Sequence, residues 1–207
     1  MTAGRNMSRV WNVWRRADMK TILVSRYHPL LVLLHWLLAV LIVAMLGAGF
    51  VLLEPMPSTD PQKIGILLIH MALGMFILAL MAVRFILRMR TARPADATTG
   101  YPVLDRIAPV THYGFYILVL LMAATGLATA ILAGLNRIVF QGSGEPLPPD
   151  FDIYPSFVAH GSLALVLAGF ISLHVAAGLY HRFVRKDLLL RRMWFGRRAS
   201  GPSAPAK

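Results

Sequence analysis

The chain has 207 residues, of which 57% are hydrophobic and 14% are charged, and its formal net charge is +12. A soluble domain carries about 25% charged residues, so this deficit excludes an ordinary soluble enzyme and indicates a protein that lies in a membrane. The absence of cysteine excludes disulfides, thiolate-bound zinc or iron–sulfur clusters, and thioether-attached haem. Any cofactor must therefore be held by histidine, carboxylate or methionine.

A basic tail, residues 1–26, opens the chain, and we expect it to lie in the cytoplasm as a solvated segment or an interfacial anchor. The apolar stretch that follows is longer than a signal-peptide core and contains His35, so we interpret it as an uncleaved anchor. Three more apolar stretches follow, and each of the four reaches the roughly 20 residues that a helix needs to cross a bilayer. The four stretches are 30–53, 64–87, 107–134 and 156–181.

These stretches predict an all-α protein in which four transmembrane helices form one bundle, residues 27–190. No room remains for a separate soluble domain. Residues 191–207 form a second basic tail, and its polar composition predicts disorder.

The basic residues are distributed unevenly between the two ends of the predicted bundle. Of the 21 Lys and Arg, 19 lie in the N-terminal tail, in residues 84–106 or in residues 182–207, whereas Lys63 and Arg137 lie in or beside the other two loops. By the positive-inside rule, both termini are cytoplasmic, N-in and C-in. We expect the charge to orient the chain in a bacterial inner membrane and to contact anionic lipid, with no nucleic-acid partner.

The candidate chemistry lies in the seven histidines. His160 and His174 are 14 residues apart in the fourth stretch, so they share one helix face at depths that differ by about 21 Å. In the predicted topology His35 has the depth of His174, and His70 has the depth of His160. A single buried histidine is typically a hydrogen-bonded packing residue. Two pairs at matched depths instead predict two haems, each held between neutral imidazoles.

An arginine is predicted beside the inner histidine pair. Arg84 lies 14 residues after His70, hence on the same face of the second helix and at the depth of the inner pair. Its guanidinium can pair there with a haem propionate. The alternative is an arginine that extends its side chain to the cytoplasmic headgroups.

Three segments resemble the bacterial cytochrome b561 family, which is related to the b-type cytochrome subunits of nickel–iron hydrogenases. They are residues 27–36 (YHPLLVLLHW), 70–84 and 160–181 (HGSLALVLAGFISLHVAAGLYH). The resemblance covers about residues 26–190 and implies a membrane cytochrome with two haem b groups that exchanges electrons with ubiquinone or another quinone. The axial ligands that it implies are His35, His70, His160 and His174.

One activity that the resemblance implies is oxidation of superoxide at the outer face with reduction of ubiquinone at the inner face. The outer loops hold five acidic residues against two basic ones, and this negative charge repels an anion at long range. Lys63, just before the second helix, can still attract superoxide locally and is a candidate catalytic residue. The charge balance also favours an outer electron-donor protein.

Three histidines remain outside the two pairs. His181 lies seven residues beyond His174, and the resemblance favours it as a catalytic residue that relays protons to quinone near the inner surface. His28, seven residues before His35, is either a second quinone residue or, as we favour, a capping or interfacial residue. His112 is expected to form an interhelical hydrogen bond or to lie beside the haem ligands.

The leading hypothesis is a diheme cytochrome b that transfers single electrons between an outer donor, superoxide included, and a membrane quinone. An alternative is the cytochrome b anchor subunit of a hydrogenase-like or other multisubunit oxidoreductase. A hypothesis from another class is a small transporter or assembly factor that uses its histidines for protons or metal. A sharp visible absorption band of the reduced protein distinguishes a cytochrome from that last class.

Overall fold

The computed structural model describes residues 23–92, 94, 102–197 and 200–201, and these residues are mostly helical. Residues 1–22 of the first predicted tail lie outside the described residues, as do 198–199 and 202–207 of the second, whereas 191–197 are described. Four helices are long: α2 (Pro29–Gly47), α3 (Gln62–Arg90), α4 (Pro102–Leu132) and α5 (Pro155–Phe183).

Shorter elements extend or connect these helices. The π-helical turn η1 (Ala48–Leu53) continues α2, and the turn η2 (Asn136–Phe140) follows α4. The four-residue helix α6 (Leu189–Arg192) follows α5. Strand β1 (Leu23–Val24) pairs antiparallel with β2 (Ser200–Gly201), which brings the first and last described residues together.

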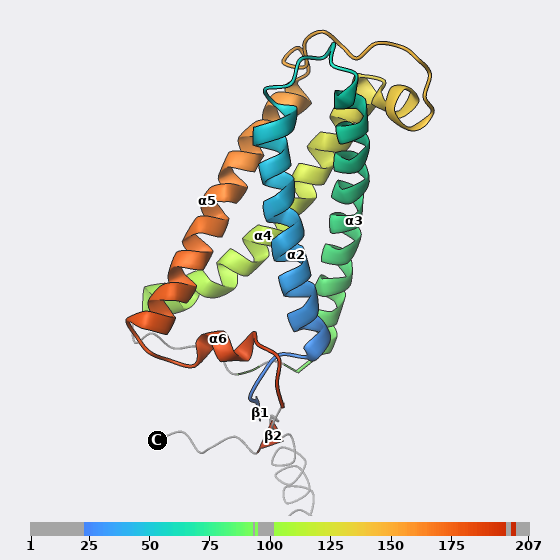
Figure 1. Ribbon diagram of the computed structural model, residues 1–207. Coiled ribbons are helices and arrows are strands. Elements are labelled where there is room, and N and C mark those ends of the chain that lie inside the picture. The colour runs from blue at the N-terminus through green and yellow to red at the C-terminus, as the bar shows by residue number, and fades with distance from the viewer. Residues whose placement is uncertain (1–22, 93, 95–101, 198–199, 202–207) are drawn as a thin grey trace, which may run out of the picture.

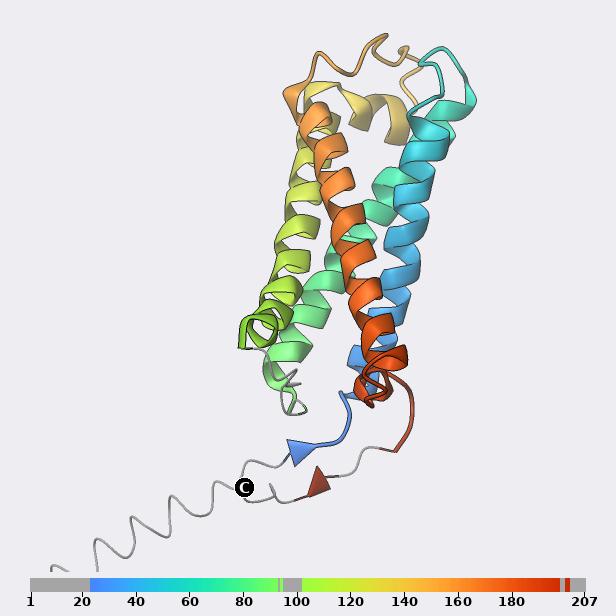
Figure 2. The same cartoon turned by 90° about the vertical axis from the view of Figure 1, so that its left-hand side faces the viewer.

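The long helices run up and down in one bundle (Figures 1 and 2), with α2 packed on α3, α3 on α4 and α4 on α5. We call the end that carries η1, η2 and residues 141–154 the loop end. The opposite end, where α2 begins and α5 finishes, is the tail end. Helix α6 lies across the tail end, between the finish of α5 and the beginning of α2 (Figure 1).

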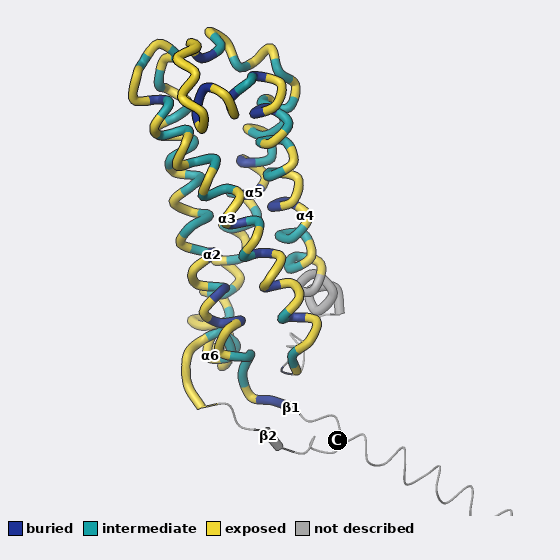
Figure 3. Tube along the Cα trace, turned by 90° about the vertical axis from the view of Figure 1, so that its right-hand side faces the viewer, coloured by how far each residue is buried: buried dark blue, intermediate teal, exposed yellow. Residues whose placement is uncertain are grey.

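All four long helices are long and apolar enough to cross a membrane, at Pro29–Leu53, Gln62–Arg90, Val110–Leu132 and Pro155–Phe183. Exposed positions recur along each of them (Figure 3), and many of these positions carry large apolar side chains. Such faces suit contact with lipid. The predicted all-α bundle of four transmembrane helices is confirmed, whereas the N-in, C-in orientation stays a prediction.

The helix starts follow from local chemistry. Proline occupies the first turn of both α2 and α5, where its missing N–H costs no hydrogen bond. Nδ1 of His28 accepts a hydrogen bond from the amide of Leu30 at 3.3 Å. This contact caps α2, so the favoured interpretation of His28 as a capping residue is confirmed.

Candidate functional site

The first histidine pair lies toward the loop end. His70 on α3 and His160 on α5 face each other with ring centroids 6.2 Å apart and ring planes at 66°. Nδ1 of His160 is 3.0 Å from the carbonyl oxygen of Met122 and 3.3 Å from the hydroxyl of Thr125, both on α4. Nδ1 of His70 is buried, with no hydrogen-bond partner among the described residues.

The second pair lies toward the tail end. His35 on α2 and His174 on α5 also have ring centroids 6.2 Å apart, with ring planes at 70°. Three further rings surround this pair. Trp36 contacts His35 at 5.3 Å, and His112 and Phe115 on α4 contact His174 at 6.1 and 5.4 Å. His112 thus lies beside the predicted ligands, which is one of the two arrangements expected for it.

Both pairs have the separation that two imidazoles need to bind one metal ion from opposite sides. An imidazole nitrogen lies about 2 Å from a bound ion and the ring centre about 1 Å further, so the two centres lie about 6 Å apart. Two histidines are too few for a bare ion, which takes four or more ligands. They suffice for haem, because the porphyrin supplies the other four nitrogens.

The surroundings of His160 also fit metal binding. A carbonyl oxygen only accepts, so the 3.0 Å contact with Met122 places a hydrogen on Nδ1 of His160 and leaves Nε2 as the free donor atom. Metal-bound histidines usually donate their second N–H in this way. The close contact depends on Gly126, because a Cβ there would lie 3.1 Å from Cε1 of the ring.

The helices that carry each pair leave room between their backbones. Helix α5 packs closely on α4, but it makes few or no close backbone contacts with α2 or α3. The rings of each pair therefore meet across helices that do not pack on one another. A flat macrocycle between facing imidazoles requires such a separation.

Arg84 lies within the bundle near the tail-end pair. Its side chain is buried, with 9% exposed, and Nη1 donates to the hydroxyl of Tyr116 on α4 at 2.6 Å. The guanidinium also lies 5.8 Å from the centroid of the Tyr116 ring. It is close enough to act electrostatically on both His35 and His174. Arg84 thus extends toward α4 rather than to a surface.

Lys63 lies at the loop end, at the start of α3, and is only 8% exposed. Its ammonium donates to the carbonyl oxygen of Met56 at 2.5 Å and lies 5.6 Å from the centroid of the Phe151 ring. Lys63 therefore ties the two loop-end segments to α3. The remaining basic residue of this end, Arg137, pairs with Glu145 at 3.1 Å on the surface.

His181 lies in the last turn of α5, at the tail end. Its Nδ1 is 2.6 Å from Oδ2 of Asp187, a residue of the turn that leads into α6. The structure thus places a carboxylate against the histidine predicted to serve quinone. The sequence analysis did not single out Asp187, and it also overlooked Gly126 and Tyr116.

Comparison with known proteins agrees with this geometry. A family model described as prokaryotic cytochrome b561 matches residues 26–196. The chain is also similar to the probable superoxide oxidase CybB of Yersinia pestis, with 28% identity over 178 residues, which cover 82% of this chain and 96% of the relative. The matched range, residues 26–196, contains both histidine pairs, Arg84 and Lys63. It also contains His181 and Asp187.

Proposed function

The chain belongs to the prokaryotic cytochrome b561 family, and from that premise we propose that it binds two b-type haems and passes single electrons between a donor at its loop end and a membrane quinone at its tail end. The family makes it a multi-pass bacterial membrane cytochrome. The observation that carries the proposal is the pair of histidine contacts, each at 6.2 Å, near opposite ends of the bundle.

In this proposal His70 and His160 hold one haem, and His35 and His174 hold the other. When bound, each haem supplies an iron centre that gains and loses one electron. The chain supplies the ligands, the hydrogen bond that fixes His160, and the positive charge of Arg84 beside the tail-end pair. With both histidines of a pair bound, an iron would have no coordination position left for oxygen, which would suit electron transfer.

The proposed orientation puts the tail end in the cytoplasm. Helix α3 finishes there with Arg88 and Arg90, and α5 and α6 add further basic residues at the same end. The charged residues of the loop end are mainly acidic. This distribution is the one that the positive-inside rule assigns to N-in, C-in proteins.

We propose superoxide as the electron donor, since the relative from Yersinia pestis is named as a probable superoxide oxidase. Two superoxide ions would each give one electron, and one quinone would take both electrons and two protons to become quinol. A protein donor is the second candidate. The excess of acidic residues at the loop end favours it, because Lys63 is buried there and Arg137 is paired.

The purified protein provides the test. We expect two extractable protohaems per chain and reduction of both by superoxide, followed by transfer of electrons to ubiquinone. A redox-difference spectrum with haem quantified per chain measures the first point, and stopped-flow mixing with superoxide measures the second. A protein without haem after growth with adequate haem supply would refute the proposal, and one haem per chain would refute its two-site form. Reduction by a protein but not by superoxide would select the second candidate.

A further inference from the structure

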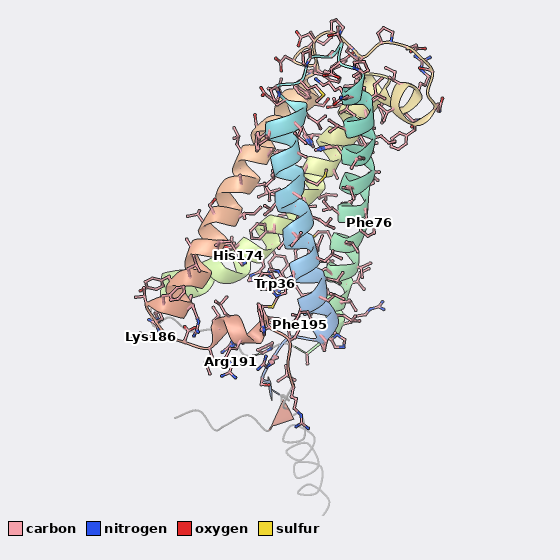
Figure 4. The ribbon with its side chains drawn as sticks, viewed as in Figure 1. Trp36, Phe76, His174, Lys186, Arg191 and Phe195 are labelled. Carbon is pink, nitrogen blue, oxygen red and sulfur yellow. The ribbon has the colours of Figure 1, made fainter. Side chains whose placement is uncertain are left out.

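The chain reverses direction immediately after α5. Lys186 adopts a left-handed conformation, with φ 55°, and the amide of Asp187 donates to the carbonyl oxygen of His181 at 3.2 Å. Residues other than glycine, asparagine and aspartate rarely adopt this conformation. The turn (Figure 4, Lys186) brings the Asp187 carboxylate back onto the ring of His181, at 2.6 Å from Nδ1.

The same carboxylate also starts α6. Its Oδ1 accepts a hydrogen bond from the amide of Leu189 at 3.0 Å, so Asp187 joins His181 to the segment that crosses the tail end. The far side of that segment is held on α2, because the indole N–H of Trp36 donates to the carbonyl oxygen of Met193 at 2.9 Å. Trp36, labelled in Figure 4, directly follows His35 in the chain, and their ring centroids are 5.3 Å apart. The segment is therefore held at His181 on one side and, on the other, next to His35 on α2.

An ionised carboxylate only accepts hydrogen bonds, so Nδ1 of His181 carries the hydrogen in this contact. That arrangement leaves Nε2 as the atom that can gain or lose a proton. The ring is part-buried, with 15% of the side chain exposed, against 36% for Asp187. His181 also lies about two helical turns, roughly 10 Å, beyond His174 on the same helix.

We propose that Asp187 is a positioning residue that fixes the tautomer and the orientation of His181, so that Nε2 of His181 delivers protons to quinone. This inference rests on the proposed quinone site at the tail end. In this inference His181 transfers the proton, and Asp187 acts only by holding His181.

Reduction of one quinone to quinol takes two electrons, which superoxide or a protein donor supplies one at a time, and two protons. For each proton, the Nε2–H bond of protonated His181 breaks while an O–H bond forms on a quinone carbonyl oxygen. Neutral His181 keeps the hydrogen on Nδ1, which it donates to the carboxylate of Asp187 in a hydrogen bond. A proton from the cytoplasmic water then restores the Nε2–H bond.

The charge of Asp187 suits this role. Partial burial acts to raise the pKa of its carboxyl, but the hydrogen bonds from His181 and Leu189, with the charges of His181 and Arg185, outweigh burial and lower the pKa below its ordinary value. The carboxylate is therefore ionised at neutral pH. Its stabilising contact is complete above the ordinary pKa of aspartate and is lost only as pH falls through the lowered value. Among the described groups, the ring of Tyr180 also contacts His181, at 6.1 Å.

The test uses Asp187→Asn, which keeps an oxygen for the Leu189 amide but removes the charge. The loaded protein is reduced in lipid nanodiscs and mixed with a short-chain ubiquinone, and haem reoxidation is followed over a range of pH. We expect reoxidation about tenfold slower at pH 7, because the ring is no longer held with its hydrogen on Nδ1. Infrared spectra, with His181→Ala as the reference that identifies the His181 bands, should show without any turnover that Asp187→Asn loses the fixed Nδ1–H tautomer.

Asp150→Asn is the matched control. Asp150 accepts from the amide two residues ahead, at 2.8 Å, as Asp187 does, but it lies at the loop end. We expect this variant to leave reoxidation by quinone and the infrared bands of His181 unchanged. If Asp187→Asn slows reoxidation but keeps the Nδ1–H tautomer of His181, or behaves as the wild type while His181→Ala is slow, the inference is wrong and the quinone site stands. If His181→Ala is as fast as the wild type, the proposed quinone site itself is wrong.

Discussion

The two histidine pairs share one geometry but have different surroundings. Each pair has ring centroids 6.2 Å apart. At the loop end, His160 is held by a neutral backbone carbonyl of α4. At the tail end, aromatic rings and the buried guanidinium of Arg84 surround the pair. The two pairs thus share their geometry, whereas their neighbours give the two ends a different charge.

This difference suggests a direction for electron flow. A positive charge favours the reduced, less positive state of a metal centre, so Arg84 should raise the reduction potential of a haem at the tail end. We then expect electrons to move from the loop end to the tail end, toward the proposed quinone site. Four sets of variants test whether the two ends differ in this way.

The largest expected effect is loss of one haem at a time. His35→Ala or His174→Ala should remove the tail-end haem, and His70→Ala or His160→Ala the loop-end haem, because each iron needs both imidazoles. The double variant of His35 and His174 should retain one haem per chain, as each single variant does, since paired residues act as a unit. The double variant of His35 and His160 should retain none. Haem content and redox titration measure these outcomes, and additive loss within a pair would refute the pairing.

Removal of the buried positive charge of Arg84 should change the reduction potential of the haem at one end only. We expect Arg84→Gln to lower the potential of the tail-end haem by about 60 mV, a tenfold change in its reduction equilibrium, and to leave the loop-end haem unchanged. Potentiometric titration of the purified protein measures both potentials. Arg88→Gln is the control, since Arg88 is equally buried on the same helix but one turn nearer its finish. An equal shift of both haems would mean that Arg84 does not distinguish the sites.

Much of this architecture could be predicted from the sequence. The lengths of the apolar stretches predicted four spans, and the 14-residue spacing of His160 and His174 predicted two sites at different depths. These features depend only on helix geometry and on the thickness of a bilayer. The structure brings together the same histidines that the topology had paired.

The neighbours of the pairs were harder to predict. Helix α4 supplies the Met122 carbonyl and Tyr116, but its nearly uniform apolar sequence does not indicate which face turns inward. The contact between His181 and Asp187 depends on the left-handed turn at Lys186, where no glycine marks the reversal. Lys63 was predicted as a local attractor of superoxide, but its burial depends on the fold of two loops. That catalytic role stays a proposal.

Lys63 tests the charge of the loop end. If its buried ammonium offsets the acidic surface, Lys63→Met should slow reduction of the haems by superoxide about threefold at low ionic strength and less at high ionic strength. Stopped-flow absorbance at two salt concentrations measures this effect. Arg137→Met removes an equal charge from an exposed ion pair and should have a smaller effect. A decrease that is the same at both salt concentrations would show that Lys63 acts only by holding the loops.

The smallest expected effect concerns the backbone next to His160. A Cβ at Gly126 would lie 3.1 Å from Cε1 and 3.3 Å from Nδ1 of the ring, so Gly126→Ala should displace the ring and weaken its bond to the Met122 carbonyl. A weaker bond makes the imidazole a poorer donor to the iron. We expect the potential of the loop-end haem to rise by about 20 mV, with that of the tail-end haem unchanged. Gly169→Ala is the matched control, because Gly169 lies at an exposed position of α5 and an added Cβ would meet no atom within 4 Å. If both alanine variants leave both potentials unchanged, the bond from His160 to α4 does not tune its site, and the contrast between the two ends rests on Arg84 alone.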